Sequence, residues 1–459
     1  MKYKSLAIII ATTALSCSAA VEIPVMKDAV FYDGYKTDVI VDAELNDGIY
    51  RLANSLYSVP LDADALKNVG TDLTLHVTLS PRCDNYDRMG CVRLAFVPKE
   101  ETRYTEDDVQ RIELARFITP FMNMNKEPDS VPYEWNISDV AYILHDPDIN
   151  ERYNLWIETY LFGVPYAARE QVEGCADHDD VYAATVWLTA DEDTDGTVAG
   201  AAVHNRLFPL YTTKSEIKGD INFNRYTEGA TDKFGKTERT FTFTTDTDLT
   251  DARLNLILTN HGADTKGEEY VRRLHNVFID GELKLSYTPG GVSCEPYRQY
   301  NSQGNMIYGK TPQTDWEEWN NWCPGQAVPV RQINLGELKA GEHSVKITVP
   351  DAQFFHNKGD FRPSLYVQGV TEGELNLSAV NQINDSELDG ITFEHIGDDI
   401  IFKSATPLRE AALYDLSGSL LEGYYNPAGI ISLAGRTPGT YILLVVARDG
   451  RYTTYKAVK

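Results

Sequence analysis

The 459-residue chain has little positive charge, because 42 Lys and Arg are set against 68 Asp and Glu and the formal net charge is −26. Like charge repels nucleic-acid phosphates and anionic lipid, so we expect no nucleic-acid partner. After residue 20, no uninterrupted apolar run reaches the length of about 20 residues that a membrane helix needs. We therefore expect no transmembrane segment in the body of the protein.

Motifs for metals and organic cofactors are also missing. The nine histidines are scattered, with no His-x-His or His-x-x-x-His, and there is no Cys-x-x-Cys, which argues against zinc and copper. Neither a glycine-rich phosphate loop nor a Gly-x-Ser-x-Gly elbow occurs. Asp191, Asp193, Asp195 and Gly196 resemble the first half of a calcium loop, but Ala202 stands where a bidentate glutamate is required. We expect no metal and no cofactor.

Residues 1–20 carry Lys2 and Lys4, then an apolar run and small residues, which is typical of a secretory signal. Cys17 fits a lipid-acceptor cysteine, whereas residues 18–20 fit plain cleavage, so both forms of processing stay open. Export predicts a location in the periplasm, on the outer-membrane surface or outside the cell.

Six cysteines in an exported chain indicate disulfides, because an oxidising compartment lets them persist. Cys83 and Cys91 lie close in sequence, and we predict a bond between them. Cys175 is then left as a buried free thiol.

Alternation with period two is the dominant pattern and indicates half-buried strands. It occurs at residues 73–80, 92–96, 254–258 and 345–349. Asp280 and Gly281 separate two apolar runs and predict a tight hairpin. Residues 107–115 fit either one short helix or a polar loop entering a strand. Sustained helical periodicity is scarce, so we predict an all-β protein.

The chain divides into four parts. After the signal at 1–20, the polar run at 191–196 separates two strand-rich stretches, and we predict one β-sandwich in 21–195 and another in 196–373. A third, small β-sandwich is expected at 378–459.

Three segments place carboxylates beside an aromatic ring, namely residues 83–88, 156–160 and 267–270. An aromatic ring offers an apolar platform to a sugar, and a carboxylate in a partly dry setting can act as a base. Taken alone, these segments also fit a structural role. Asp84 and Asp87 can simply form a turn between two strands, and most glutamates lie exposed at the surface.

In their order along the chain, together with residues 116–121 and 322–329, these segments resemble the bacterial peptide-N-glycosidase F family from about residue 60 to residue 370. The resemblance implies two side-by-side eight-stranded jelly rolls. It also implies an amidase that cuts between an asparagine side chain and the first N-acetylglucosamine of an N-linked glycan and leaves aspartate. Its partners would be N-glycoproteins or glycopeptides, and we expect a monomer.

The resemblance places the catalytic base at Asp87, supported by Glu158 and Glu269, with Glu268 as a register alternative. Because pairing with Asp87 would lower the pKa of that carboxyl, we expect Arg88 to point at sugar oxygens instead. The substrate-binding residues implied are Arg88, Tyr160, Trp322, Trp319, Tyr270 and Arg273. Arg273 and His275 fit either an orienting pair for Glu269 or an outward pair on a strand.

Three features qualify this resemblance. Tyr160 and Tyr270 replace tryptophans of the family, and Trp319 stands at or near the place of a family arginine that holds the substrate. The position of Trp319 motivates an alternative function, a catalytically silent glycan-binding surface protein.

The resemblance also implies a disulfide between Cys294 and Cys323.

Residues 378–459 resemble the small sorting domain at the C-termini of exported proteins of the Bacteroidetes lineage. The likeness lies in the Asp-Leu-Ser-Gly turn at 415–418 and the final residues 455–459. It implies a role in export or surface display, or a plain accessory module, and no catalysis.

Overall fold

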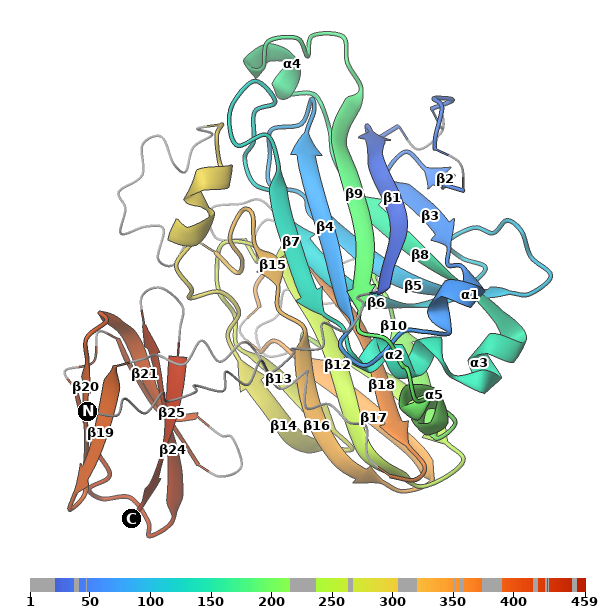
Figure 1. Ribbon diagram of the computed structural model, residues 1–459. Coiled ribbons are helices and arrows are strands. Elements are labelled where there is room, and N and C mark those ends of the chain that lie inside the picture. Colours follow the sequence, from blue (N-terminus) through green and yellow to red (C-terminus); the bar gives the residue numbers. More distant parts are fainter. Residues whose placement is uncertain are drawn as a thin grey trace, which may run out of the picture.

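The computed structural model describes residues 21–36, 41–46, 48–214, 237–262, 267–303, 320–350, 352–354, 359–373, 390–415, 420–425, 427, 429–447 and 452–459. These ranges consist mostly of antiparallel strands (Figure 1), which confirms the predicted all-β class. The helices are short and lie in connections: α1 (Ala63–Leu66), α2 (Asp139–Leu144), α3 (Pro147–Arg152), α4 (Ala168–Gln171), α5 (Thr197–Ala202) and a 3-10 helix (Glu295–Tyr300). None of the described helices has the length and apolar character of a membrane span.

The first sandwich packs a four-stranded sheet against a six-stranded sheet. The four-stranded sheet has the order β1 (Val21–Tyr32), β9 (Asp180–Ala190), β4 (Thr74–Pro81) and β7 (Val131–Asn136). The six-stranded sheet has the order β15 (Ala327–Val328), β6 (Gln110–Ile118), β5 (Met89–Pro98), β8 (Tyr153–Leu161), β3 (Leu56–Pro60) and β2 (Tyr50–Ala53). β15 comes from the second half of the chain and pairs with β6 at one edge.

The second sandwich is built from two four-stranded sheets. One has the order β10 (Asn205–Tyr211), β18 (Asp360–Val370), β12 (Leu249–His261) and β16 (Arg331–Leu338). The other has the order β11 (Glu238–Thr245), β17 (Gly341–Thr348), β13 (His275–Ile279) and β14 (Glu282–Tyr287).

Both sandwiches have the strand order of an eight-stranded jelly roll. Without the edge strands β2 and β15, eight strands of the first sandwich remain, and both sandwiches then follow one scheme along the chain. If the eight strands of each sandwich are numbered 1 to 8 along the chain, one sheet has the order 1-8-3-6 and the other has the order 2-7-4-5. The predicted pair of jelly rolls is therefore confirmed.

The local sequence patterns account for the strands. In β4, Leu75, Val77 and Leu79 are fully buried while the alternate residues are partly exposed. Asp280 (φ 50°) and Gly281 (φ 83°) form the tight hairpin between β13 and β14, where both residues need a positive φ. Residues 107–109 form a turn that leads into β6, so the loop alternative is correct for this segment.

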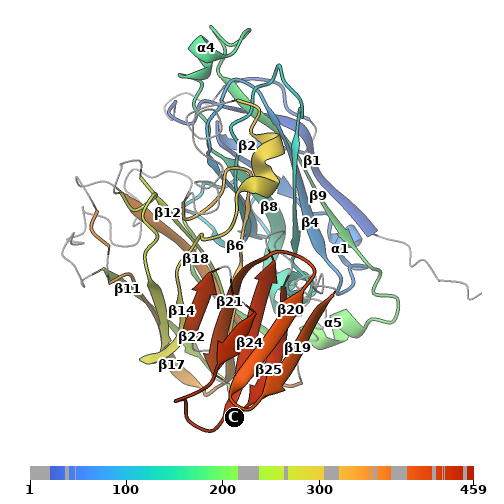
Figure 2. The same cartoon turned by 90° about the vertical axis from the view of Figure 1, so that its left-hand side faces the viewer.

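The second sandwich covers the outer face of the six-stranded sheet (Figure 1, Figure 2), and this contact places the two jelly rolls side by side. Its apolar part joins Cys91 and Tyr160 of the first sandwich to Ile257 of the second. β5 is consequently buried on both faces along nearly its whole length.

Buried arginines cross the same interface. Arg116 binds Glu113 through two N–H···O contacts of 2.7 and 2.8 Å. It also donates to the Thr259 hydroxyl at 2.7 Å and to the Arg362 carbonyl at 2.6 Å, both in the second sandwich. Arg93 donates in the same way to the Thr213 carbonyl at 2.6 Å. A buried cation without such partners would be costly, so the network fixes the relative position of the sandwiches.

The C-terminal residues form a third, smaller β-sandwich. Its sheets have the orders β19 (Ile391–Ile396), β20 (Asp399–Ser404), β23 (Ile430–Ser432) and β22 (Leu420–Tyr425), β21 (Leu408–Asp415), β24 (Thr440–Ala447), β25 (Tyr452–Val458). Ile400, Leu413 and Leu443 are fully buried between them.

Two disulfides are present, and one of them corrects a prediction. Cys294 is bonded to Cys323, the pairing that the resemblance implied. Cys83 is bonded to Cys175 instead of Cys91. Cys91 lies in β5 and points into the interface between the sandwiches, away from the Cys83 loop, so it is the buried free thiol. Cys17 and residues 18–20 lie outside the described residues.

Peptide mapping of the non-reduced protein should recover Cys83 linked to Cys175 and Cys91 as a thiol that reacts only after unfolding. Replacing both Cys83 and Cys175 by serine should lower the free energy of unfolding by about 2–5 kcal/mol, because a long loop is no longer closed. Cys91→Ala is the matched control, since it removes a buried thiol and breaks no disulfide. A peptide joining Cys83 to Cys91 would contradict the assignment.

A second buried acid links the sandwiches. Asp139 of α2 accepts a hydrogen bond from the Gln332 side chain of β16 at 2.5 Å, and its carbonyl accepts one from Gln368 of β18 at 3.1 Å. Burial raises the pKa of Asp139 from 3.8 to about 6, opposed by the charge of Arg253.

Since the folded-state pKa of Asp139 is raised, its contribution to stability is fully present below about pH 4 and is lost as the pH rises through about 6. Asp139→Asn should therefore increase the free energy of unfolding at pH 7.5 by up to about 3 kcal/mol, while leaving it nearly unchanged at low pH. Urea unfolding at both pH values measures this. Glu151→Gln, an exposed change on α3, should alter neither value by more than about 0.5 kcal/mol. An equal effect of Asp139→Asn at both pH values would rule the explanation out.

Candidate active site

Residues 82–88 form a loop between β4 and β5 that is fastened to the first sandwich at several points. The disulfide of Cys83 holds one end of the loop. In its centre, the Tyr86 carbonyl accepts hydrogen bonds from the Thr119 hydroxyl at 2.8 Å and from the Tyr182 hydroxyl at 2.9 Å. The loop is therefore held in one conformation before any ligand binds.

Asp84 is the structural carboxylate of this loop. It is fully buried, and its oxygens accept from the Val164 N–H at 2.6 Å, the Tyr86 N–H at 3.0 Å and the Arg88 Nε at 2.8 Å. The interpretation as a turn residue is thus correct for Asp84. Arg88 forms its ion pair with Asp84. We had expected that it would not pair with Asp87.

Asp87 is placed differently. Within the described residues, no other side chain donates a hydrogen bond or forms an ion pair to its carboxylate, which remains partly exposed. Burial of Asp87 raises its pKa well above 3.8, the negative charge of Glu269 raises it further, and Arg88 opposes both effects. Such a carboxylate binds a proton more readily than an ordinary aspartate, which a general base requires.

Glu269, in the second sandwich, lies close enough to Asp87 for its negative charge to act on that carboxylate. It lies in the turn at 267–270, and its Oε2 accepts from the Gly262 N–H at 2.9 Å. Burial raises the pKa of Glu269, while this hydrogen bond and one from Tyr270 lower it. The fold thus brings together two of the three acids that the sequence predicted, one from each sandwich.

Glu268 is the structural neighbour, which decides between the two registers. It is fully buried and accepts from both Arg273 nitrogens Nε and Nη2, at 2.9 and 3.2 Å, and from the backbone N–H groups of Gln353 and Phe354. Arg273 therefore holds Glu268 and not Glu269, and the predicted substrate contact of Arg273 is corrected. His275 is buried as well and bonds to the Arg273 carbonyl, so an outward-facing pair is also wrong.

Glu158 is not brought to the other two acids by any contact within the described residues. It is fully buried in the six-stranded sheet, 3.0 Å from Arg111 Nε and 3.7 Å from Arg93 Nη1, and it accepts from the Tyr104 hydroxyl at 3.1 Å. The predicted contact of Glu158 with water or sugar is therefore wrong. Its carboxylate belongs to the network of buried charges around Arg93 and Arg111. The physical reason is that Tyr104, from the connection between β5 and β6, and two arginines of the same sheet cover the Glu158 carboxylate.

The predicted aromatic platforms are also buried. Tyr160 has no exposed surface, and the Arg93 guanidinium lies 5.6 Å from its ring centre. Trp322 is 4% exposed and donates its indole N–H to the Asn260 carbonyl at 3.1 Å. Both side chains pack in the interface, so neither offers a face to a sugar in this structure. Trp319 lies outside the described residues.

Other rings surround the Asp87 loop instead, and two of them were missed in the sequence. The Arg88 guanidinium lies 5.2 Å from the ring centre of Tyr86, 5.8 Å from that of Phe162 and 5.9 Å from that of Tyr166. Tyr166 is 54% exposed and Tyr270 is 38% exposed. Phe162 and Tyr166 follow the end of β8. The only sequence signal for them is their place shortly after the segment at 156–160.

The acidic residues that resemble a calcium loop have structural partners. The Asp191 carboxylate accepts from the Asp72 N–H at 2.7 Å, and that of Asp195 accepts from the Thr197 N–H at 3.1 Å at the start of α5. One group with metal-ligand spacing occurs in the described part of the chain, Cys83 with His178 and Asp180. The sulfur of Cys83 is bonded to Cys175, so this group is not a thiolate site.

Two family matches cover most of the two jelly rolls. Residues 22–175 match the family described as peptide-N-glycosidase F, N terminal, and residues 230–368 match the one described as peptide-N-glycosidase F, C terminal. No curated protein matches the chain.

Solved structures add a likeness in fold. PNGF-II in space group C2 is 20% identical with a TM-score of 0.54, over 78% of this chain and 66% of that one. Its P21 form is 20% identical with a TM-score of 0.55, over 76% and 65%. PNGase F from Flavobacterium meningosepticum, described as a glycosylasparaginase, is 13% identical with a TM-score of 0.46, over 78% and 97%. The present chain thus spans slightly less than two thirds of the length of PNGF-II.

Proposed function

Because this chain belongs to the peptide-N-glycosidase F family, we propose that it hydrolyses the amide bond between an asparagine side chain and the first N-acetylglucosamine of an N-linked glycan. The products are an intact glycan and a peptide that carries aspartate. The observation that carries the proposal is that burial and the negative charge of Glu269, a residue of the second sandwich, raise the pKa of Asp87, whose carboxylate has no side-chain partner among the described residues.

The reaction needs only water as a second substrate. Ionised Asp87 takes a proton from a water molecule, whose oxygen attacks the carboxamide carbon. The carbon–nitrogen bond then breaks, and the departing nitrogen receives the proton that Asp87 had taken. The glycosylamine so formed loses ammonia to water in solution. Glu269 holds the attacking water and keeps the proton affinity of Asp87 high through its negative charge.

Arg88 supplies positive charge next to both acids. It uses Nε for Asp84, and its positive charge lowers the pKa of Asp87 and of Glu269. We assign its Nη groups to substrate oxygens, including the carboxamide oxygen that gains negative charge during attack.

The exposed rings beside the acids fit the sugar and the peptide. Tyr166 and Tyr270 are exposed, and the ring centre of Tyr86, the neighbour of Asp87 in the chain, lies 6.2 Å from that of Tyr166. A pyranose ring packs its apolar face on such rings while its hydroxyl groups remain free to hydrogen-bond. These residues take the role that the sequence had given to Tyr160 and Trp322.

A second candidate function is a catalytically silent glycan-binding protein, which Trp319 in the place of a family arginine favours. It would use the same rings and bind glycan without releasing it.

We also propose that the protein is exported, to the periplasm, the cell surface or the medium, with or without a lipid on Cys17. The two disulfides support this, because such bonds persist in oxidising compartments. The separate C-terminal sandwich is proposed to serve sorting or display.

Asp87→Asn should lower kcat/KM for glycan release by about 10²–10⁴-fold, because it removes the general base. The assay incubates protein with a denatured N-glycoprotein and follows released glycan together with the conversion of asparagine to aspartate by mass spectrometry. Asp64→Asn is the matched control, the same chemical change at an exposed position of α1.

Two outcomes would decide against the proposal. If Asp87→Asn releases glycan at the parent rate, Asp87 is not the base. If the parent protein binds N-glycopeptides but releases nothing, the silent binding protein is the correct reading.

Glu269→Gln should change the pH profile as well as the rate. The base works only when ionised, so activity rises with pH through the pKa of Asp87, and this rise lies well above pH 3.8. Removing the charge of Glu269 lowers the pKa of Asp87, so the rise in residual kcat/KM should move to lower pH. Glu282→Gln, an exposed change on β14, should leave the profile in place. A profile that does not move in Glu269→Gln would show that the two acids are not coupled.

A further inference from the structure

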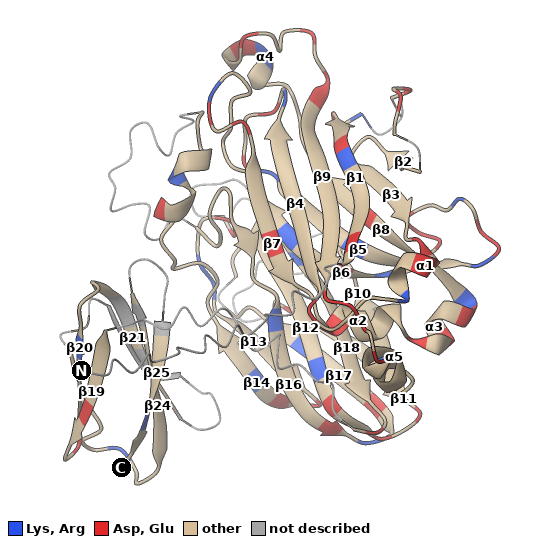
Figure 3. Ribbon diagram, in the orientation of Figure 1, with Lys and Arg blue, Asp and Glu red and all other residues tan. Residues whose placement is uncertain are grey.

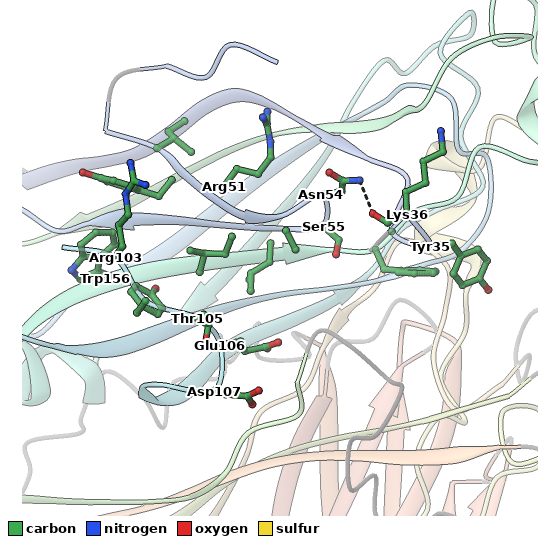
Figure 4. A pocket seen from close by; sticks show the side chains of 18 of the residues that line it. Tyr35, Lys36, Arg51, Asn54, Ser55, Arg103, Thr105, Glu106, Asp107 and Trp156 are labelled. Carbon is green, nitrogen blue, oxygen red and sulfur yellow. Dashed lines mark hydrogen bonds between the residues drawn. The ribbon is translucent and has the colours of Figure 1, made fainter. Parts of the chain in front are cut away.

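A cavity of about 990 Å³ opens beside the Asp87 loop and does not include Asp87 itself. It lies over β2 and β3, between residues 34–36 on one side and 102–107 on the other, with Trp156 and Phe162 of the β8 segment in its wall. Figure 4 shows Tyr35, Lys36 and Asn54 near one end and Trp156 with Arg103 near the other. Its volume lies at the upper end of the range for small-molecule sites.

The wall of this cavity combines aromatic rings with polar groups. Tyr35 is 69% exposed and Tyr50 is 38% exposed. Tyr50 and Tyr104 flank Trp156 with ring centres 5.1 and 5.5 Å from it. The Trp156 indole N–H is buried and, within the described residues, has no hydrogen-bond partner. Trp156 itself is 5% exposed, so Tyr35 and Tyr50 are the rings that a ligand can contact.

Phe162 joins this cavity to the catalytic residues. Its ring lies 5.3 Å from that of Tyr35 inside the cavity and 5.8 Å from the Arg88 guanidinium on the other side. A Cβ at position 34 would come within 2.7 Å of the Phe162 ring, so Gly34 leaves the space that this ring occupies. Trp156 lies six strand residues from Phe162, or about 20 Å. The cavity therefore leads away from Arg88 over a length that holds several sugars.

The charges in the wall favour an uncharged ligand. Arg51 donates to the carbonyls of Val41 and Ala43, and Lys36 is paired with Asp179. Acidic side chains are spread over both sandwiches (Figure 3), and the net charge of −26 repels acidic sugars.

We propose that this cavity is a distal glycan subsite, which binds the outer, uncharged sugars of the N-glycan while the innermost sugar lies at Asp87. The inference rests on the proposed function, because it takes the glycan as substrate. Tyr35 and Tyr50, the exposed rings of the wall, stack on sugar faces. Binding energy from this remote part of the substrate then contributes to kcat/KM for long glycans.

The test compares two glycopeptides with one peptide sequence, one carrying a long neutral glycan and one trimmed to its innermost sugars. Tyr35→Ala and Tyr50→Ala change exposed rings and should leave the fold intact. Each should lower the ratio of kcat/KM for long over trimmed glycan by roughly three- to tenfold. Tyr166→Ala, at the cleavage site, should lower both values and keep the ratio. Leu283→Ala, an exposed apolar residue on β14, should change neither value.

A binding measurement separates this inference from the proposed function. Titration of the long neutral glycan, without peptide, into Asp87→Asn protein should give an affinity that Tyr50→Ala weakens by a similar factor. That result supports the subsite even if the parent protein releases no glycan. Equal losses for long and trimmed substrates, or a loss that follows the length of the peptide instead of the glycan, would overturn the assignment.

Discussion

The covered outer face of the six-stranded sheet is the constraint on which the rest of the structure depends. Arg93 and Arg116 lie in that face without exposed surface, and their partners come from both sandwiches. A buried guanidinium that loses a partner costs several kcal/mol, so a small rotation between the jelly rolls is strongly disfavoured. Glu158 belongs to this network, which explains why an acid in the middle of a strand stays fully buried.

This rigid contact determines what happens at its edge. Asp87 is carried by a loop of the first sandwich and Glu269 by a turn of the second, so their separation follows from how the sandwiches pack. Glu269 raises the pKa of Asp87 only because the interface holds it there. The pair of acids is therefore a property of the interface, and neither jelly roll contains it alone.

The sequence predicted the strands and turns correctly, but it failed for residues that are covered or bonded by a segment distant in the chain. Period-two alternation identified β4, because one of its faces meets the core, and the turn residues Asp280 and Gly281 identified the hairpin, because both tolerate a positive φ. Alternation in β8 shows that Glu158 and Tyr160 share a face, but not that Tyr104 covers Glu158 and that the second sandwich covers Tyr160, so both were taken for cleft residues. The bond from Cys83 was misassigned for a related reason, since its partner Cys175 is 92 residues away.

The loop with two aspartates shows how one short motif can supply both a structural and a chemical acid. If Arg88 paired with Asp87, its charge would hold the pKa of that carboxyl low and weaken it as a base. Asp84 takes the Arg88 Nε instead, together with two backbone N–H groups. Arg88 is thereby fixed near both reacting acids while Asp87 keeps its proton affinity. For the proposed reaction, Asp84 therefore acts as a positioning residue, because it decides which carboxylate the arginine binds.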